Sequence, residues 1–309
     1  MAFESYQQFW DNQAITPESA LAAVDGSSDE TIVQRTGRFA AAQVMAALDL
    51  QPADHVLDLG CGVGRIGREL AAHCKHWTGV DISKRMFDHA ETRLAHLDNI
   101  SLHQLNRTDL QMIPDARIDK AYSVAVLCHM DKEDMFLYLE ELNRVLKPGG
   151  AIFVDTWNLA HPVGWKRWQY EVRFWQKSEQ SQRKDVARNQ FCAPEEFQVY
   201  LKQAGFQPIA SFDNSPWIQA VAGKNMARKQ LKQEQKRVGK QQGQIAYSPL
   251  FSELFSQTVD IIYGQLHPRE AIAFLDKHVG GDEETLYRPF ILGLWESNTA
   301  QWGEINNQN

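Results

Sequence analysis

Four residues at alternate positions, Asp58, Gly60, Gly62 and Gly64, carry the clearest chemical signal in the chain. Apolar residues flank Asp58, as expected for a buried parallel strand over 55–59, and the glycines follow at once. Glycine permits a sharp backbone turn, and a ligand can approach it without meeting a Cβ atom. The carboxylate inside the strand can reach a ligand ammonium group. The segment therefore predicts a small-molecule site on a strand–turn–helix unit.

The glycines also fit a second type of site. Gly62, Gly64 and Gly67 spell G-x-G-x-x-G, and Asp81 follows about 20 residues later, as in dinucleotide-binding folds. Asp58 argues against that alternative, because a pyrophosphate gains nothing from a carboxylate inside the strand. The motifs further along the chain decide between the two types of ligand.

Those later motifs resemble, in the same order, the motifs of class I S-adenosylmethionine-dependent methyltransferases. A second strand ends in Asp81, and Asp109 follows a third strand. Residues 146–150, Leu-Lys-Pro-Gly-Gly, resemble the family's helix-to-strand turn before the fifth strand. The pattern covers residues 51–224, more than half of the chain. The resemblance implies that the chain binds S-adenosylmethionine and transfers its methyl group.

The resemblance also assigns contacts with the cofactor. The Asp81 carboxylate would accept hydrogen bonds from both ribose hydroxyls, and bonds of this charge-assisted type contribute about 1.5–3 kcal/mol. Asp109 would contact the adenine amino group, unless it caps a helix or forms an Asx turn. Arg38 would lie near the methionine carboxylate, unless it is a surface arginine. The full predicted set is Arg38, Asp58, Gly60, Gly62, Asp81, Ile82, Asp109, Leu110 and Val126.

His129, directly after the fourth strand, is the candidate general base. A base is required only when the acceptor has to lose a proton; otherwise methyl transfer depends on alignment and on exclusion of water. The alternative is a histidine that caps the helix beginning near Asp131. The strand does not end in the Asp/Asn-Pro-Pro-aromatic motif of enzymes that methylate exocyclic amines, so such acceptors are disfavoured.

An insertion over 157–193, between the fifth strand and the next helix, is rich in aromatic and basic residues. Relatives use this region to cover the acceptor, and flat rings beside cations suit a sugar, an aromatic ring or a phosphorylated group. The alternative is a helix over 163–176 whose aromatic side chains are buried. The predicted acceptor contacts are Trp157, His161, Trp165 and Tyr170.

Strands and helices alternate from residue 54 onward, which predicts an α/β fold with a doubly wound, mostly parallel, seven-stranded sheet of the Rossmann-like methyltransferase type. Residues 1–50 read as an N-terminal helical cap whose aromatic residues either close over the cofactor or pack on the domain. The methyltransferase domain then covers 51–225, and 226–309 form a helical C-terminal extension.

The extension begins with a basic segment over 224–240. It is either a solvated helix or a face for an anionic partner such as nucleic acid or a lipid headgroup. The helices that follow have apolar faces, which must dock on the catalytic domain or on another subunit. A homo-oligomer formed through these helices is therefore a further expectation.

Composition narrows the functional classes. A net charge of −7 argues against a protein built chiefly to grip nucleic acid. The four cysteines are scattered, so we expect neither a metal site nor disulfides, and with no signal peptide or apolar span we expect a cytoplasmic protein. The favoured function is methylation of a small-molecule or glycan-type acceptor, preferably at oxygen. The alternatives are a nucleic-acid methyltransferase and a non-catalytic, cofactor-binding regulatory subunit.

Overall fold

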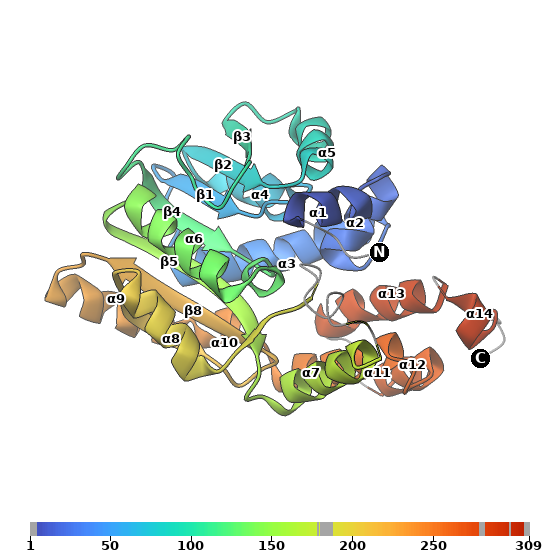
Figure 1. Cartoon of the computed structure of the whole chain (residues 1–309). Helices are drawn as coiled ribbons and strands as arrows, with labels where there is room; N and C mark the ends of the chain where they lie inside the picture. Colours follow the sequence, from blue (N-terminus) through green and yellow to red (C-terminus); the bar gives the residue numbers. More distant parts are fainter. Residues whose placement is uncertain (1–4, 178, 180–187, 278–281, 297, 306–309) are drawn as a thin grey trace.

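Short apolar runs form the strands of one central sheet. The computed structural model describes residues 5–177, 179, 188–277, 282–296 and 298–305. Its strands are β1 His55–Leu59, β2 His76–Asp81, β3 Ile100–Gln104, β4 Ile118–Ser123, β5 Leu146–Asn158, β6 Phe191–Cys192, β7 Phe206–Phe212 and β8 Trp217–Lys224. Their order is β3-β2-β1-β4-β5-β8-β7, with β6 paired to β5 (Figure 1). Only β8 runs antiparallel to its neighbours.

This sheet confirms the predicted doubly wound, mostly parallel fold. It has eight strands instead of seven, because Phe191 and Cys192 at the end of the insertion pair with β5. Residues 146–150 begin β5 as a bulge, since Ile118 pairs with Leu146 but Lys120 pairs with Ala151. The left-handed backbone of Gly149 (φ 83°) permits this bend.

Helices cover both faces of the sheet. They are α1 Tyr6–Gln13, α2 Pro17–Asp25, α3 Glu30–Leu48, α4 Arg65–Leu70, α5 Lys84–Leu94, α6 Lys132–Val145, α7 Pro162–Trp175, α8 Pro194–Gln203, α9 Arg228–Lys240, α10 Gln242–Ile245, α11 Pro249–Ile262, α12 Pro268–Leu275, α13 Asp282–Glu296 and α14 Thr299–Trp302, with single 3₁₀ turns at Ala71–His73 and Leu127–His129. Side chains cap the start of two of these helices: Asp29 accepts from the first amides of α3, and Ser248 accepts from Phe251 N in α11.

Alternation along β1 decides which face each side chain meets. Leu57 and Leu59 pack into the core under α6 and α8. Val56 packs into the second core, which α3, α4, α9 and α10 cover. Asp58, two residues after Val56, therefore points to the side of α3 and α4, where it meets Tyr122 of that second core.

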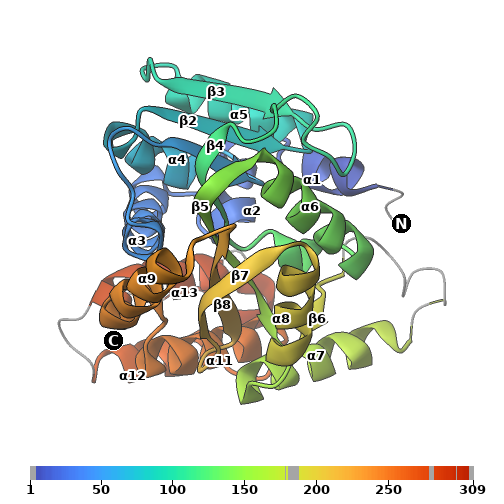
Figure 2. The same cartoon turned by 90° about the vertical axis from the view of Figure 1, so that its left-hand side faces the viewer.

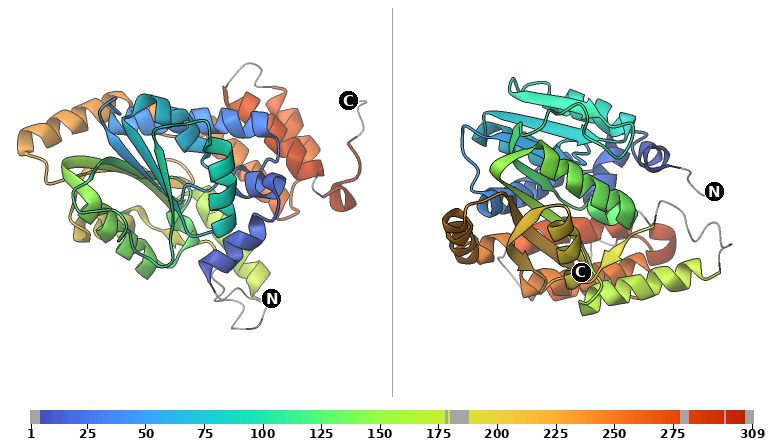
Figure 3. Two further views of the ribbon diagram at one scale, coloured as in Figure 1. Left: turned by 90° about the horizontal axis from the view of Figure 1, so that it is seen from above. Right: turned by 60° about the vertical axis from the view of Figure 1, so that its left-hand side comes forward.

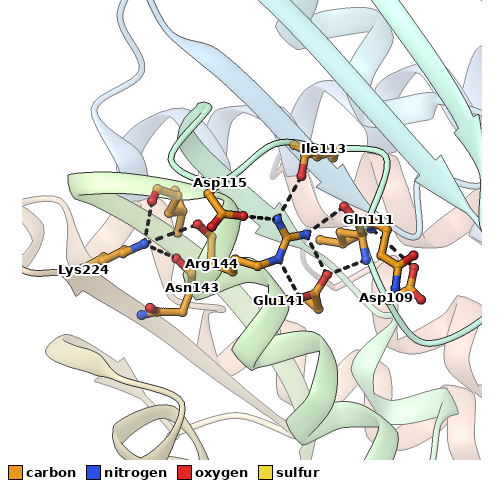
Figure 4. Close-up of polar contacts among 10 residues, drawn as sticks. Asp109, Gln111, Ile113, Asp115, Glu141, Asn143, Arg144 and Lys224 are labelled. Carbon is orange, nitrogen blue, oxygen red and sulfur yellow. Dashed lines mark hydrogen bonds and ion pairs between the residues drawn. The ribbon is translucent and has the colours of Figure 1, made fainter.

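The loop between β3 and β4 is held against α6 by one arginine (Figure 4). Arg144 donates to both Glu141 oxygens at 2.8 Å and to Asp115 Oδ1 at 2.6 Å. It also donates to the backbone carbonyls of Ile113 and Leu110. The planar guanidinium group serves several acceptors at once, so it fixes the path of the loop that follows β3.

The N-terminal and C-terminal helices lie at the same end of the sheet (Figures 1 and 3). Tyr6 of α1 donates to Asp134 at the start of α6, and Asp11 accepts from Ser83 after β2. The helix α11 lies beside both α7 and α12 along the lower side of the molecule (Figure 2). Within the described residues, no helix has both the length and the apolar character needed to cross a membrane.

Candidate functional site

One cavity of about 720 Å³ lies beyond the carboxyl ends of β1, β2 and β4. This is where open α/β sheets bind their ligands. Its walls come from α1, α2 and α3, from the glycine turn after β1, and from α11 and α13. The lining includes seven of the predicted contacts: Asp58, Gly60, Gly62, Asp81, Ile82, Val126 and His129. An eighth, Trp157, lines the part nearer α11.

The turn after β1 requires glycine for both conformation and space. Gly60, Gly62 and Gly64 all have left-handed backbones, with φ of 78°, 53° and 74°. A Cβ atom on Gly60 would lie 2.5 Å from Val126 side-chain atoms, and one on Gly62 would lie 2.8 Å from Val24. Close packing on both sides brings the backbone amides of the turn to the cavity.

Asp81, at the end of β2, locks the turn to the next loop. Its Oδ2 accepts from Gly62 N and its Oδ1 accepts from Ser83 N, both at 2.8 Å. Burial raises the pKa of Asp81 to about 6, although these two amide bonds oppose the shift. Each carboxylate oxygen keeps acceptor capacity after one bond, so Asp81 can also accept from ligand hydroxyls.

Asp58 is a second buried acid on the same cavity. Tyr122 Oη donates to Asp58 Oδ2 at 2.7 Å, and Trp77 Nε1 donates to Tyr122 Oη at 3.0 Å. Burial raises the pKa of Asp58 to about 7, against the opposing effects of Tyr122 and Arg65. Two buried carboxyl groups with raised pKa values in one cavity mark a candidate functional site, and a cationic ligand would favour their ionised forms.

The cavity contains an arginine that the sequence prediction missed. Arg38 is 65% exposed, pairs with Glu69 and does not line the cavity. Arg65, directly after the glycine turn, does line it. Its charge opposes the burial that raises the pKa of Asp25, Asp58 and Asp155. The sequence feature that could have identified Arg65 is its position as the first residue of the helix that follows the glycine turn.

Asp109 and Leu110 also lie outside the cavity. Asp109 Oδ1 accepts from Gln111 N at 3.3 Å, the Asx turn that was the alternative prediction, and its Oδ2 lies 3.3 Å from Arg107 Nε. Leu110 is buried, and its amide donates to Glu141 (Figure 4). Residues 105–108, which directly precede Asp109 in the chain, line the cavity instead.

His129 ends the 3₁₀ turn after β4 and lines the cavity beside Trp10, with the ring centroids 5.0 Å apart and edge to face. Burial, and then the charge of Arg167, lower the pKa of His129 to about 4, so the imidazole is neutral at pH 7. It does not cap the next helix: α6 begins after Asp131 without a side-chain cap. A neutral imidazole that lines the cavity is able to accept a proton.

Asp155, a second residue that the prediction missed, holds the loop that precedes His129. The Asp155 carboxylate is 1% exposed, and it accepts from Ala125 N at 2.7 Å. Ala125 has the left-handed φ of 58°, which is uncommon for a residue with a Cβ atom. The hydrogen bond stabilises this turn and so places Val126 against Gly60.

The insertion contributes less to the cavity than predicted. Trp157 is buried and stacks on Trp217 at 4.4 Å. The helix of the alternative prediction does form, as α7, but its aromatic side chains are not buried as that alternative expected. Three predicted acceptor contacts lie on it or at its start, outside the cavity: His161 accepts from Val163 N, Trp165 is 45% exposed, and Tyr170 donates to Asp260.

Residues of the C-terminal extension take the place of these contacts. Tyr247, Phe251 and Phe255 line the cavity beside Trp157 and Trp217. The sequence showed an amphipathic helix over 250–262, but an apolar face alone does not tell which surface it meets. No local signal could therefore have assigned these rings to the cavity.

The residues at the glycine turn fit S-adenosylmethionine. Asp58 and Asp81 carry raised pKa values, which an ammonium group and ribose hydroxyls would lower again. Asp25 Oδ2 is also buried at the cavity without a hydrogen-bond partner among the described residues. Buried polar atoms are normally paired, so this oxygen points to a polar ligand.

Comparison with known proteins agrees with this fit. Residues 56–150 match a family described as a methyltransferase domain. O-methyltransferase resE of Aspergillus sclerotiorum is 33% identical over 134 residues, 42% of this chain and 49% of that protein. 27-O-demethylrifamycin SV methyltransferase of Amycolatopsis mediterranei is 26% identical over 215 residues, 68% of each chain. The chain thus spans about half of the first relative and two thirds of the second.

A solved structure shares the fold. The DhpI–SAH complex superposes with a TM-score of 0.51 at 17% identity, over 72% of this chain and 97% of that one. The strand order, the glycine turn and the family match agree with one another. The match over residues 56–150 and the shared fold are both consistent with a class I S-adenosylmethionine-dependent methyltransferase domain.

Proposed function

We propose that the protein transfers the methyl group of S-adenosylmethionine to an oxygen atom of a small molecule. The observation that carries this proposal is a single cavity that joins the acids Asp58 and Asp81 to a neutral histidine and an aromatic wall. Relatives named as O-methyltransferases support the preference for oxygen.

Each residue would have a separate task. Asp81 would hold the ribose hydroxyls, Asp58 the amino group and Arg65 the carboxylate of the methionine part. The bound cofactor supplies an electrophilic methyl group. His129 would accept the acceptor's proton, and the closed aromatic wall would exclude water.

A small acceptor is favoured over nucleic acid by the place of the basic helix. The residues that line the cavity come from helices at both ends of the chain, but none comes from α9. Helix α9 packs on β7 instead. Its lysines therefore form a separate solvated face, as in the simpler prediction.

Calorimetry with S-adenosylmethionine, S-adenosylhomocysteine and NAD tests the cofactor assignment. Both sulfur-containing ligands should bind, and NAD should not. Asp81→Ala should weaken binding about tenfold or more, because charge-assisted hydrogen bonds contribute about 1.5–3 kcal/mol. Asp88→Ala, which removes an exposed acid on α5, is the matched control and should leave the affinity unchanged. Binding of NAD in preference to the other two ligands would contradict the assignment.

The affinity for S-adenosylhomocysteine should rise as the pH increases from 5 to 7. In the free protein the pKa of Asp58 is about 7 and that of Asp81 about 6, so both acids are protonated at pH 5. The ligand ammonium favours ionised Asp58, so binding must release the proton, and affinity increases until the acid is ionised beforehand. Titrations at several pH values measure the slope, and Asp58→Asn should reduce it. An equal slope in that variant would assign the linked proton to another group.

A further inference from the structure

We propose that the acceptor is a planar aromatic molecule with an anionic oxygen substituent, a carboxylate or phenolate, and that the C-terminal extension selects it. This inference rests on the proposed function, because it concerns the part of the same cavity that lies away from the glycine turn. It follows from two groups of residues there, an aromatic ladder and a polar corner.

The aromatic ladder consists of Phe39, Tyr247, Phe251 and Phe255, all of which line the cavity. The rings of Phe39 and Tyr247 are 6.5 Å apart with planes at 21°. Tyr247 and Phe251 are 3.8 Å apart, and Phe251 and Phe255 are 5.6 Å apart, each pair with planes at 12°. Each of these four rings, from α3 and the extension, is therefore nearly parallel to the next one along the ladder.

Parallel rings suit a planar ligand in particular. Aromatic rings attract one another in offset-stacked or edge-to-face arrangements with centroids 4.5–7 Å apart, as a general rule. A flat ligand can stack over its whole face on the outer ring of such a set, whereas a flexible aliphatic chain loses conformational freedom when it lies on the same ring. The stacked pair Trp157 and Trp217 borders Phe255 and extends the same wall.

The ladder is held by buried and partly buried polar contacts of the extension. Lys166 of α7 donates to Asp260 and Ser256 of α11 at 2.7 and 2.6 Å. Tyr247 N donates to Gln219 Oε1, and the side chains of Gln43 and Gln219 both donate to Ile245 O. These contacts fix α11 before any ligand binds, so the ring orientation is preorganised.

The polar corner consists of Trp157 Nε1, Asn189 Oδ1 and the Arg167 guanidinium group, on residues that all line the cavity. Trp157 Nε1 and Asn189 Oδ1 are buried and have no hydrogen-bond partner in the described part of the chain. Arg167 lies 4.3 Å from the Trp157 ring centroid. Arg167 Nε and Asn189 Nδ2 both donate to Glu171 Oε1.

An unpaired donor, an unpaired acceptor and a cation in one corner specify the edge of a ligand. Trp157 Nε1 needs an acceptor atom and Asn189 Oδ1 needs a donor. Arg167 pairs with the buried Glu171 through Nε, and its Nη1 and Nη2 donors would serve a ligand oxygen that carries negative charge. A planar ring that carries a carboxylate or phenolate and a hydroxyl group satisfies all three. A neutral hydrocarbon would leave both buried atoms unpaired.

Calorimetry with the full chain saturated with S-adenosylhomocysteine tests this inference with three probes. They are 2-naphthoate, 2-naphthamide and decanoate, which separate planarity from charge. We expect 2-naphthoate to bind about tenfold or more tightly than either of the others. Decanoate that binds as tightly as 2-naphthoate would overturn the planar acceptor, and equally tight 2-naphthamide would overturn the anionic one.

Variants test whether the preference for 2-naphthoate comes from the aromatic ladder and the polar corner. Phe251→Leu and Phe255→Leu keep an apolar side chain, and should weaken 2-naphthoate about tenfold while they leave decanoate nearly unchanged. Phe174→Leu, at a position 65% exposed on α7, is the matched control. Arg167→Gln should remove the preference for naphthoate over naphthamide, and Arg167→Lys should restore part of it. A preference that survives Arg167→Gln in a folded variant would contradict the role of Arg167.

The same titrations separate this inference from the proposed function. If S-adenosylhomocysteine binds but the three probes bind alike, the acceptor class is wrong and the cofactor assignment stands. If S-adenosylhomocysteine does not bind, the probes are titrated alone. A preference for naphthoate then supports the aromatic site and overturns the proposed methyl transfer.

Discussion

A chain that ends at Lys224 is expected to lose the cooperative thermal transition of the full protein. The residues that would be removed complete the core on one face of the sheet, where Val238 and Ile245 pack with α3. Arg237 donates to Ala46 O and Ala47 O at 2.7 and 2.6 Å, which satisfies carbonyls at the end of α3.

The truncation would also remove buried hydrogen bonds, in addition to the lost apolar packing. Gln43 and Gln219 are 3% and 1% exposed, and both donate to Ile245 O. Each buried amide left without a partner costs about 1–3 kcal/mol. Domains are stable by only about 5–15 kcal/mol, so these terms and the exposed core together exceed the margin.

Calorimetry or circular dichroism during heating measures the outcome. A chain that ends at Ala246 is the matched control, because it keeps α9 and α10 and the Ile245 carbonyl. We expect it to melt cooperatively at a lower temperature than the full chain. If the chain ending at Lys224 melts at the same temperature as the full protein, the extension is an independent module and not part of the fold.

His129→Ala is expected to lower turnover by about 10²–10⁴-fold, the usual effect of removing a general base. Cofactor affinity should stay nearly unchanged, because His129 contacts Trp10 and the acceptor side of the cavity instead of the acids at the glycine turn. With a pKa of about 4 in the free protein, the imidazole is unprotonated from pH 5 to 8. The rate should therefore show no ionisation of His129 in that range.

The measurement is methyl transfer from S-adenosylmethionine to a hydroxylated planar acid that the protein turns over, with cofactor affinity determined on the same sample. Trp165→Ala is the matched control. The sequence predicted a contact between Trp165 and the acceptor, but its side chain is 45% exposed and outside the cavity, so turnover should not change. Full activity of His129→Ala would show that the acceptor arrives already ionised and needs no base.

Local chemistry in the sequence was sufficient for the residues at the glycine turn and the strand ends, but not for Arg38, Asp109 and Leu110, which lie outside the cavity, or for Arg65, which lines it. Gly60, Gly62 and Gly64 were predictable because only glycine adopts left-handed φ angles without strain. Asp58 and Asp81 were predictable because a strand and its neighbour end at the same edge of a parallel sheet. These features depend on a few consecutive residues.

The residues at the other end of the cavity, where we propose that the acceptor binds, are brought together by contacts between distant segments. Trp165 and Tyr170 have the composition of a binding surface, yet α7 directs them elsewhere, and Arg38 points to Glu69. Phe251 and Phe255 read only as the apolar face of a helix, since periodicity identifies such a face without naming its partner. Docking of α11 beside Trp157 turned that face into a cavity wall. Only the tertiary structure shows which surface this helix face contacts, because packing between segments that are distant in the sequence depends on the shapes of both segments.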